Sequence, residues 1–338
     1  MKRRTLKLTA AALAAAAALA LSACSSVGTT AKSSGDASAS AASGPFDYTD
    51  ARGEKVHLDE VPTTVVAQSS VAASLWDAGY HVAGVYGELT PVDGKLSYQA
   101  GSIDLDKVTV LGKTYGEFDT EKYGLMNPQL LVDYSFDGKS LWYVPAEQSK
   151  QILALAPSVA VPGTYKDTTT AIETFVDLAG KLGANTKSAA LEAEKADYDK
   201  ALEQISAIAA DSGLKVVIMS GDKDSLYVVD PQNLSEATTL KDKGLDIIAP
   251  AKHTTDTFQQ YSWEQASEFA DADVILFDAR IYDSFKSDLA KIPTWTSLPA
   301  VKAGQVYGWY AAAPYSYKSY AKIFQDLADE LKSAKKLG

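Results

Sequence analysis

Short apolar runs rich in β-branched residues alternate with helical patterns over most of the chain after Pro45. This alternation is typical of parallel sheets that are covered by helices. The runs form two series, and each series could build one α/β lobe. The first series consists of residues 64–67, 82–86, 108–111, 130–134 and 159–161. The second consists of residues 215–219, 226–229, 246–248, 274–277 and 305–307.

Helical patterns at residues 169–182 and 187–210 separate the two series. At 1.5 Å per residue, the second helix would be about 36 Å long. It could connect two lobes as a stiff strut, although an ordinary surface helix of one large domain would give the same pattern. Its apolar residues recur at helical spacing; they are Leu191, Tyr198, Leu202, Ile205 and Ala209. A last helix, near residues 317–332, carries an apolar stripe that we expect to pack in the core.

The first residues of the chain have the order of an export signal. Four basic residues lie within the first seven positions, and an apolar run follows from residue 8 to residue 21. This run is short for a membrane-spanning helix, which needs ~20 apolar residues. The four residues Leu21-Ser22-Ala23-Cys24 resemble the lipobox of bacterial lipoproteins. The resemblance implies cleavage before Cys24 and a diacylglycerol group on its thiol, and an ordinary secretory peptide is the alternative.

Residues 25–44 consist mostly of Ser, Ala, Gly and Thr and offer little to bury, so we expect a flexible tether there. The rest of the chain is long enough to divide into two cores. The expected organisation is a lipoprotein signal peptide at 1–23, the tether at 24–45, an N-terminal lobe at 46–165, connecting helices at 166–212 and a C-terminal lobe at 213–338.

The net charge limits the possible partners. The chain has a formal charge of −11, and removal of residues 1–23 takes away four positive charges and no negative ones, which leaves −15. Nucleic acid is therefore not expected as a partner, because phosphate binding needs a basic face. The same acidity opposes attachment to anionic lipid, so the acyl group on Cys24 is the expected membrane contact.

The two halves of the chain share a local pattern of helix start, acid and buried strand. Glu121 follows Thr120 at the start of one expected helix, and Glu264 comes shortly after Ser262 at the start of another. Thr120 and Ser262 are the expected N-caps, so both glutamates fall in first turns. Negative charge in that position complements the helix dipole.

Several segments in a fixed order resemble a known family. They are Val61-Pro62, Val65-Val66 and residues 75–85, 121–132, 181–183, 262–276 and 295–307. In this order and spacing, the chain resembles the substrate-binding proteins that serve importers of ferric siderophores, haem and cobalamin. The resemblance implies an α/β fold with two Rossmann-like lobes, joined by a single long rigid helix, and a ligand cleft between the lobes. It also implies a monomer that delivers its ligand to an ABC permease dimer with its ATPase.

In that family an acid on each lobe pairs with arginines of the permease. Glu121 and Glu264 match the two positions, so the resemblance implies a docking role for both. Exposed ion pairs of this kind tune docking more than they add affinity. Helix capping alone is the alternative.

Aromatic residues are frequent where the expected strands end, which is where open α/β sheets bind ligands. Rigid rings can grip a bulky, partly apolar metal chelate, and phenol groups can bind its oxygens. For each ring, core packing is the alternative. The expected ligand-binding residues are Tyr86, Tyr115, Tyr134, Trp142, Tyr227, Phe258, Arg280 and Trp309.

The arginine content favours one type of chelate. After residue 23 the chain has only two arginines, Arg52 and Arg280. A tris-catecholate complex of iron is strongly anionic and needs a cluster of cations, whereas the planar fork of Arg280 suits hydroxamate oxygens. Lysines number 26 in the same part of the chain, so a catecholate site built from lysines stays open. Pairing of Arg280 with Asp278 or Asp283 is the structural alternative.

Other classes of function lack their motifs. The three histidines, His57, His81 and His253, lie far apart, so direct ligation of a bare metal ion is not expected. Neither a Gly-x-Ser-x-Gly elbow nor a Gly-x-x-x-x-Gly-Lys phosphate loop occurs, so no catalysis and no cofactor are expected. A tethered hydrolase and an adhesive lipoprotein are the alternatives from other classes.

These features predict a substrate-binding lipoprotein of an ABC importer. It would be held outside the cytoplasm, on the cell membrane, by lipid on Cys24. Its expected ligand is a ferric siderophore of hydroxamate type, and haem or cobalamin are the alternative ligands within the same family.

Overall fold

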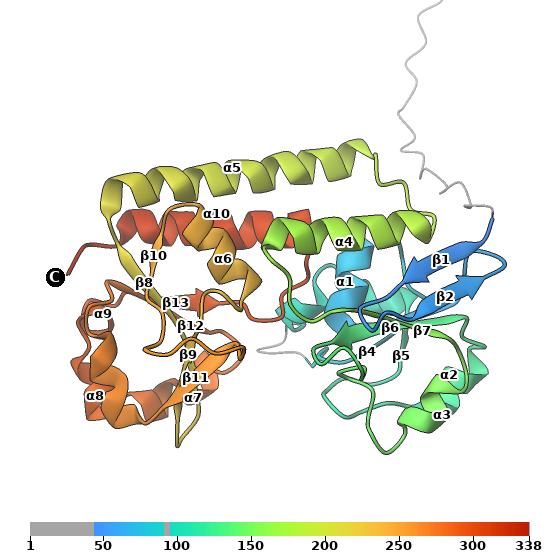
Figure 1. Ribbon diagram of the computed structural model, residues 1–338, viewed down its shortest axis with the longest axis horizontal. Helices are drawn as coiled ribbons and strands as arrows, with labels where there is room; N and C mark the ends of the chain where they lie inside the picture. The colour runs from blue at the N-terminus through green and yellow to red at the C-terminus, as the bar shows by residue number, and fades with distance from the viewer. Residues whose placement is uncertain (1–43, 91–94, 338) are drawn as a thin grey trace, which may run out of the picture. The chain divides into compact units, whose positions relative to one another are not determined.

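The computed structural model describes residues 44–90 and 95–337, which belong to one compact unit. The expected signal peptide, Cys24 and nearly all of the expected tether lie outside these residues. The described part contains two separate sheets of mainly parallel strands, each covered by helices (Figure 1). The expected α/β fold with two sheet-bearing lobes is therefore confirmed.

The first lobe contains a five-stranded parallel sheet in the order β5-β4-β3-β6-β7. Alternate side chains of β6 belong to two different groups of buried residues, because successive residues of a strand point to opposite faces of the sheet. Leu130 and Val132 pack with α1 and α4, whereas Leu131 packs with α2 and α3. The strands are β3 (Val65–Gln68), β4 (Gly84–Tyr86), β5 (Thr109–Val110), β6 (Leu130–Ser135) and β7 (Ser158–Pro162), and the helices are α1 (Ser69–Asp77), α2 (Thr120–Leu125), α3 (Ser149–Leu153) and α4 (Thr168–Lys181).

The second lobe contains a sheet in the order β11-β9-β8-β12-β13, with β10 added beside β8. The expectation of parallel pairing is wrong for β9, which runs antiparallel to both of its neighbours, β8 and β11. The turn from β8 to β9 explains the hairpin, because the carboxylate of Asp222 accepts hydrogen bonds from the backbone N–H groups of Asp224 and Ser225. The strands are β8 (Lys215–Gly221), β9 (Leu226–Val229), β10 (Asp246–Ile247), β11 (Phe258–Tyr261), β12 (Val274–Asp278) and β13 (Val306–Trp309).

An N-terminal hairpin, β1 (Phe46–Thr49) and β2 (Lys55–Leu58), precedes the first lobe and was not expected from the sequence. Its turn is held against β7 by Asp50, whose carboxylate accepts a hydrogen bond from the backbone N–H of Ala160 at 3.0 Å. The same carboxylate binds Nε of Arg52 at 2.8 Å.

The two sheets are linked by α5 (Ala189–Ser212), which packs along α10 (Tyr317–Ser333), as Figure 1 shows. The 24 residues of α5 match the expected helix closely and correspond to a length of about 36 Å. Ser188 caps its first turn, and Gly213 ends it in the left-handed region at φ 57°. The connection between the two lobes therefore consists of two packed helices, α5 and α10, and not of α5 alone.

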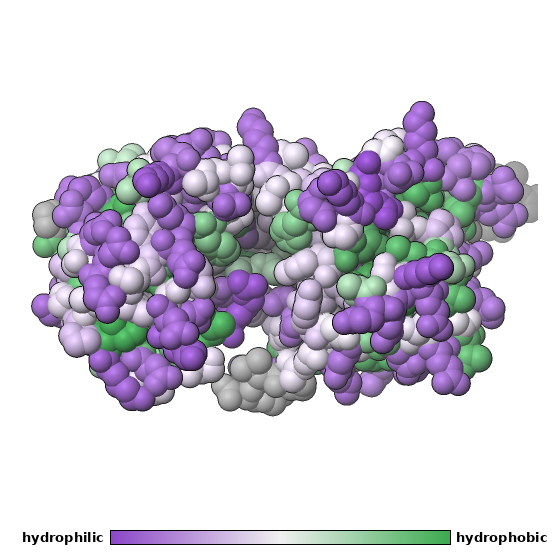
Figure 2. Space-filling model, turned by 60° about the horizontal axis from the view of Figure 1, so that its bottom comes forward, coloured by the Kyte–Doolittle hydropathy of each residue, from purple (hydrophilic) through white to green (hydrophobic). Residues whose placement is uncertain are grey.

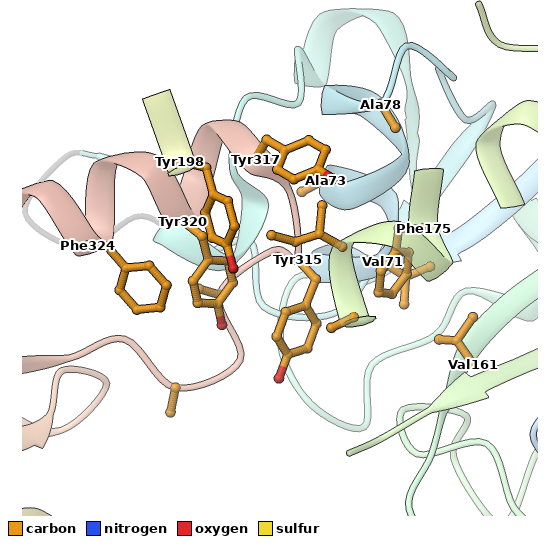
Figure 3. Packing of buried hydrophobic residues seen from close by; sticks show 14 of the residues in the cluster. Val71, Ala73, Ala78, Val161, Phe175, Tyr198, Tyr315, Tyr317, Tyr320 and Phe324 are labelled. Atoms are coloured by element: carbon orange, nitrogen blue, oxygen red, sulfur yellow. The ribbon is translucent and has the colours of Figure 1, made fainter. Parts of the chain in front are cut away.

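One aromatic core joins these helices to the first lobe. The ring of Tyr198 on α5 lies 5.5 Å from that of Tyr317 and 6.0 Å from that of Phe324, both on α10. The ring of Tyr315 stacks on Tyr320 at 5.4 Å, and Figure 3 shows these side chains beside residues of α1 and α4. The expected apolar stripe of the last helix is thus confirmed as core packing.

The remaining helices are short and lie around the second sheet or in the loops of the first. They are η1 (Tyr98–Ala100), η2 (Leu105–Lys107), α6 (Ser235–Asp242), η3 (Trp263–Phe269), α7 (Tyr282–Leu289), α8 (Pro293–Ser297) and α9 (Pro299–Lys302). Within the described residues no helix combines the length and the hydropathy that a membrane crossing requires. Figure 2 shows one face of the molecule, where hydrophilic side chains predominate and apolar ones are scattered.

A buried carboxylate ties the first lobe to the start of α10. Asp77, the last residue of α1, accepts hydrogen bonds from the hydroxyl groups of Ser102 and Ser316, and Nζ of Lys318 lies 3.7 Å from it. Asp77→Ala leaves these groups without their acceptor. We expect the free energy of unfolding to fall by roughly 1–3 kcal/mol.

Urea unfolding at neutral pH measures this loss. The matched control is Asp326→Ala, which breaks an exposed ion pair with Lys322 on α10. That control should lose less than about 1 kcal/mol. Equal losses in the two variants would contradict a structural role for the buried carboxylate.

Candidate functional site

A buried aspartate lies at the carboxyl end of a central strand in each sheet. In the first lobe this residue is Asp133 on β6, which accepts hydrogen bonds from the hydroxyl of Tyr86 at 2.9 Å and from the backbone N–H of Tyr143 at 3.0 Å. Burial raises the pKa of Asp133 to about 7, since loss of hydration outweighs these hydrogen bonds. Asp133 therefore fixes the loop that carries Tyr143 onto the end of the sheet.

The corresponding residue of the second lobe is Asp278 on β12, and it holds the expected ligand residue Arg280. The carboxylate of Asp278 accepts hydrogen bonds from Nε of Arg280 at 3.0 Å and from Nη2 at 2.6 Å, and from the hydroxyl of Ser220 at 3.0 Å. One edge of the guanidinium group is thus bound by Asp278, which is one of the two pairings named as the structural alternative. The side chain of Arg280 remains 36% exposed, so its other edge can meet a ligand.

Aromatic rings form a continuous group at the carboxyl end of the first sheet. Tyr115 contacts Tyr143 at 5.1 Å, and Tyr143 contacts Trp142 at 4.7 Å. Trp142 contacts Phe136 at 4.8 Å, and Phe136 lies 6.2 Å from Tyr134. The structure therefore brings together three of the expected residues, with Tyr143 and Phe136 as links between them. We call these five residues the first aromatic group.

The first aromatic group presents both exposed rings and supporting rings. Tyr115 is 62% exposed and Phe136 is 56% exposed, so these two rings form the part of the group that faces solvent. Tyr134 is buried, and Tyr86 is fully buried with its hydroxyl bound to Asp133. In this conformation Tyr86 and Tyr134 support the surface and do not form it.

The expected residues of the second lobe also lie together. The ring of Phe258 lies 6.3 Å from Tyr227 and 5.9 Å from Trp309. Trp309 pairs with Asp278 across the β12–β13 register, which places this second aromatic group beside the Arg280 pair. Tyr227 and Phe258 are partly exposed, whereas Trp309 is buried.

The charge of Arg280 acts on side chains of the first lobe. The positive charge of Arg280 acts on Tyr143 of the first lobe, where it opposes the increase in pKa that burial causes in that phenol. It also acts on Tyr98, whose hydroxyl donates a hydrogen bond to the backbone carbonyl of Ala311 at 2.6 Å. Arg280 therefore lies within electrostatic reach of side chains from the first lobe.

A cavity of about 740 Å³ opens beside Tyr115, Trp142 and Tyr143. Within the described residues its walls come from the first lobe alone, and they include one acid and two cations: Glu147, Arg52 and Lys139. Its size is within the range of small-molecule sites. Arg52, however, is paired with Asp50, so neither arginine of the described chain carries an uncompensated charge.

Sequence reasoning missed Tyr143, Phe136 and Glu88. The hydroxyl of Tyr143 lies 3.4 Å from Oε1 of Glu88, and the backbone N–H of Tyr115 donates to the same oxygen at 3.1 Å. Glu88 comes two residues after β4, so the rule that ligands bind at strand ends could have found it. Tyr143 lies in a long loop, where the sequence gives no signal of its contact with β6.

Both expected docking acids are exposed and lie in first turns. Glu121 is the second residue of α2, but the N-cap is Asp119, which accepts from the backbone N–H of Lys122 at 2.9 Å. The expectation that Thr120 is the cap is wrong, because its hydroxyl binds Oε1 of Gln148 at 2.7 Å.

In the second lobe the expected cap is confirmed. Ser262 and Gln265 form a capping box at the start of η3, which carries Glu264. Hydrogen bonds from Ser262 and from the helix backbone hold the pKa of Glu264 below its usual value. The glutamate is therefore ionised at neutral pH.

Among the described residues there is no group of three or more His, Cys, Asp or Glu side chains that could hold a metal ion. His253 binds Oδ2 of Asp230 at 2.8 Å, and His57 binds Oδ1 of Asp47 at the same distance. The geometry of the strand ends fits an organic chelate better than a bare ion, since aromatic rings predominate there.

Comparisons with known proteins agree with this fold. The sequence model of a family described as periplasmic binding protein matches residues 65–313. DesE, a ferric-siderophore receptor protein from Streptomyces coelicolor, is 35% identical; the match covers 87% of this chain and 100% of that one, with a TM-score of 0.78. No curated protein matches the chain.

Two more distant structures share the fold. The siderophore periplasmic binding protein from the fuscachelin gene cluster of Thermobifida fusca is 22% identical, with a TM-score of 0.57, over 80% of this chain and 97% of that one. FhuD from Vibrio cholerae, a siderophore-binding protein solved with Fe3+-Desferal, is 16% identical, with a TM-score of 0.57, over 79% of this chain and 97% of that one.

The chain belongs to the periplasmic binding protein family, as the resemblance implied. It is accordingly a binding protein and not an enzyme, with a substrate-binding role outside the cytoplasm.

The raised pKa of Asp133 predicts a pH effect on stability. Its ordinary value is 3.8 and its folded value is about 7, so between these pH values the folded state keeps a proton that the unfolded state has released. This contribution makes the protein less stable as pH rises from 4 to 7 and then levels off. Asp133→Asn has no titrating carboxyl group at this position. Its free energy of unfolding, relative to that of the wild type, should therefore increase over that pH range.

Chemical unfolding at several pH values measures the difference between the two curves. Asp137→Asn is the control, because hydrogen bonds from Ser140 and Lys139 lower the pKa of that exposed acid and move its effect to more acidic pH. Parallel curves for the wild type and Asp133→Asn would contradict the assignment.

Proposed function

We propose that this chain captures a ferric siderophore of hydroxamate type and delivers it to an ABC permease dimer with its ATPase. It does so as a monomer, anchored to the cell membrane by lipid on Cys24. The ligand lies between the first aromatic group and the second, with the free edge of Arg280 on its oxygens. Haem and cobalamin lack a specific observation in their favour.

The observation that carries this proposal is the match to DesE, described as a ferric-siderophore receptor, along the full length of that protein. The charges of the site support the hydroxamate type. Arg280 is neutralised by Asp278, and Glu88 adds a negative charge near Tyr143. A strongly anionic catecholate complex would need more cations than Lys139 of the cavity wall supplies, whereas a ferric hydroxamate of low charge can bind through aromatic contact and hydrogen bonds.

Uptake of radioactive iron, supplied as ferrioxamine, tests the proposal in cells that lack this chain. The full-length protein should restore uptake. Cys24→Ala should be released from the membrane fraction and restore less, although its ligand affinity is unchanged. Restoration by a ferric catecholate and not by ferrioxamine would overturn the ligand type. Equal membrane retention of Cys24→Ala would overturn the anchor.

A further inference from the structure

The outer surface of the first lobe carries an apolar pair beside its docking acid. Leu125 comes four residues after Glu121 on α2, and residues at that spacing share a face of an α-helix. Leu155, just after α3, lies against the same helix, since a Cβ built at Gly124 would be 3.7 Å from its Cδ1 atom. We call Glu121, Leu125 and Leu155 the α2 surface.

Both leucines lie largely in water. Leu125 is 76% exposed and Leu155 is 42% exposed. Exposed side chains of this size contribute little to the core, so packing within the lobe does not account for them. Adjacent apolar side chains beside an exposed charge are typical of a protein contact site.

The second lobe lacks this feature at the equivalent place. The residues three and four positions after Glu264 on η3 are Ser267 and Glu268, and both are polar and exposed. In the described residues, the large apolar side chains with the highest exposure all belong to the first lobe, at positions 96, 115, 125, 136 and 155. Both lobes thus carry an exposed acid in the first turn of a helix, but only the first lobe carries exposed apolar side chains beside that acid.

The charges decide between the possible occupants of the α2 surface. Among the described residues Glu121 takes part in no ion pair, so its carboxylate is available to a cation. An anionic lipid surface would repel it, as it would the chain as a whole, whose formal charge is −11. A second copy in a symmetric dimer would place two Glu121 side chains close to each other, and like charges oppose that contact.

We propose that the α2 surface docks on the permease through both its acid and its leucines. Glu121 then pairs with a cation of the permease, and Leu125 and Leu155 are buried against apolar side chains of the permease. The first lobe then supplies a docking contact that resists salt, and the second lobe supplies a purely electrostatic one. This inference rests on the proposed function, because it requires delivery to a permease, and it takes Glu121 and Glu264 as the docking acids that the family resemblance implies.

The test is the affinity of the full-length protein for its own permease–ATPase complex in nanodiscs, at about 0.05 M and about 0.5 M salt. Leu125→Ser should weaken docking about tenfold at both salt concentrations, because burial of apolar surface does not depend on charge screening. Glu264→Gln should weaken docking at low salt, and its effect should largely disappear at high salt. Leu155→Ser should act in the same way as Leu125→Ser, but less strongly.

The matched control is Leu96→Ser, a leucine that is exposed to about the same extent as Leu155; it lies outside α2 and α3 and should dock normally. Wild-type docking by Leu125→Ser, or a loss that shrinks with salt, would overturn the inference while the effect of the acids stands. If Glu121→Gln and Glu264→Gln also dock normally, the docking part of the proposed function fails as well.

Discussion

Arg280→Ala lowers the affinity for ferrioxamine about 100-fold in our account. The free edge of the guanidinium is the cation that the end of β12 offers to the chelate, and hydrogen bonds to a charged donor are strong. Isothermal titration with the full-length protein measures the effect. Arg280→Lys should recover only part of the affinity, because an ammonium group cannot contact Asp278 and a ligand oxygen with the same fixed geometry.

Removal of Arg280 also leaves the buried carboxylate of Asp278 without its ionic partner, so stability must be measured in parallel. Ser220 still donates to that carboxylate in the variant. Lys322→Ala removes the same charge from the surface of α10 and should bind ferrioxamine normally. A folded Arg280→Ala variant with normal affinity would place the ligand away from the end of β12.

Glu121→Ala combined with Glu264→Ala reduces iron uptake almost to the background of cells without the protein, and it leaves ligand affinity unchanged. Both carboxylates are exposed and belong to neither aromatic group, so we expect neither to contact the ligand. Their loss affects docking alone. Uptake of iron supplied as ferrioxamine and titration of the same variant measure the two properties separately.

The control for charge is Glu60→Ala combined with Glu203→Ala, which removes two other exposed acids. That variant should transport normally. If the Glu121 and Glu264 variant lost ligand affinity and kept uptake, the docking roles would be contradicted.

Most of the sheet could be predicted from the sequence, because buried parallel strands appear as continuous apolar runs. Residues 130–134 and 274–277 are such runs, and they became β6 and β12. The strand β11 was missed because its sequence, Phe-Gln-Gln-Tyr, belongs to an edge strand with partly exposed glutamines. The pairing of β8 with β9 depends on the turn at Asp222, which hydrophobic patterns do not report.

The candidate site could be predicted in outline only. The rule that ligands bind at the carboxyl ends of strands selected rings that the structure places in two groups. It did not separate exposed Tyr115 from fully buried Tyr86, because exposure depends on how loops fold over the strand ends. Tyr143 joins the first group only through its backbone contact with Asp133, ten residues earlier in the chain, and the sequence pattern gives no sign of it.

The measurement that tests the central claim most directly is quenching of tryptophan fluorescence in the full-length protein. Trp142 and Trp309 belong to the two aromatic groups, so a bound ferric chelate would lie near both. Ferrioxamine, ferrichrome, a ferric catecholate, haem and cobalamin are titrated in parallel. The account predicts saturable quenching by the ferric hydroxamates alone. Saturable quenching by the catecholate, haem or cobalamin instead, or by none of the five, would contradict it.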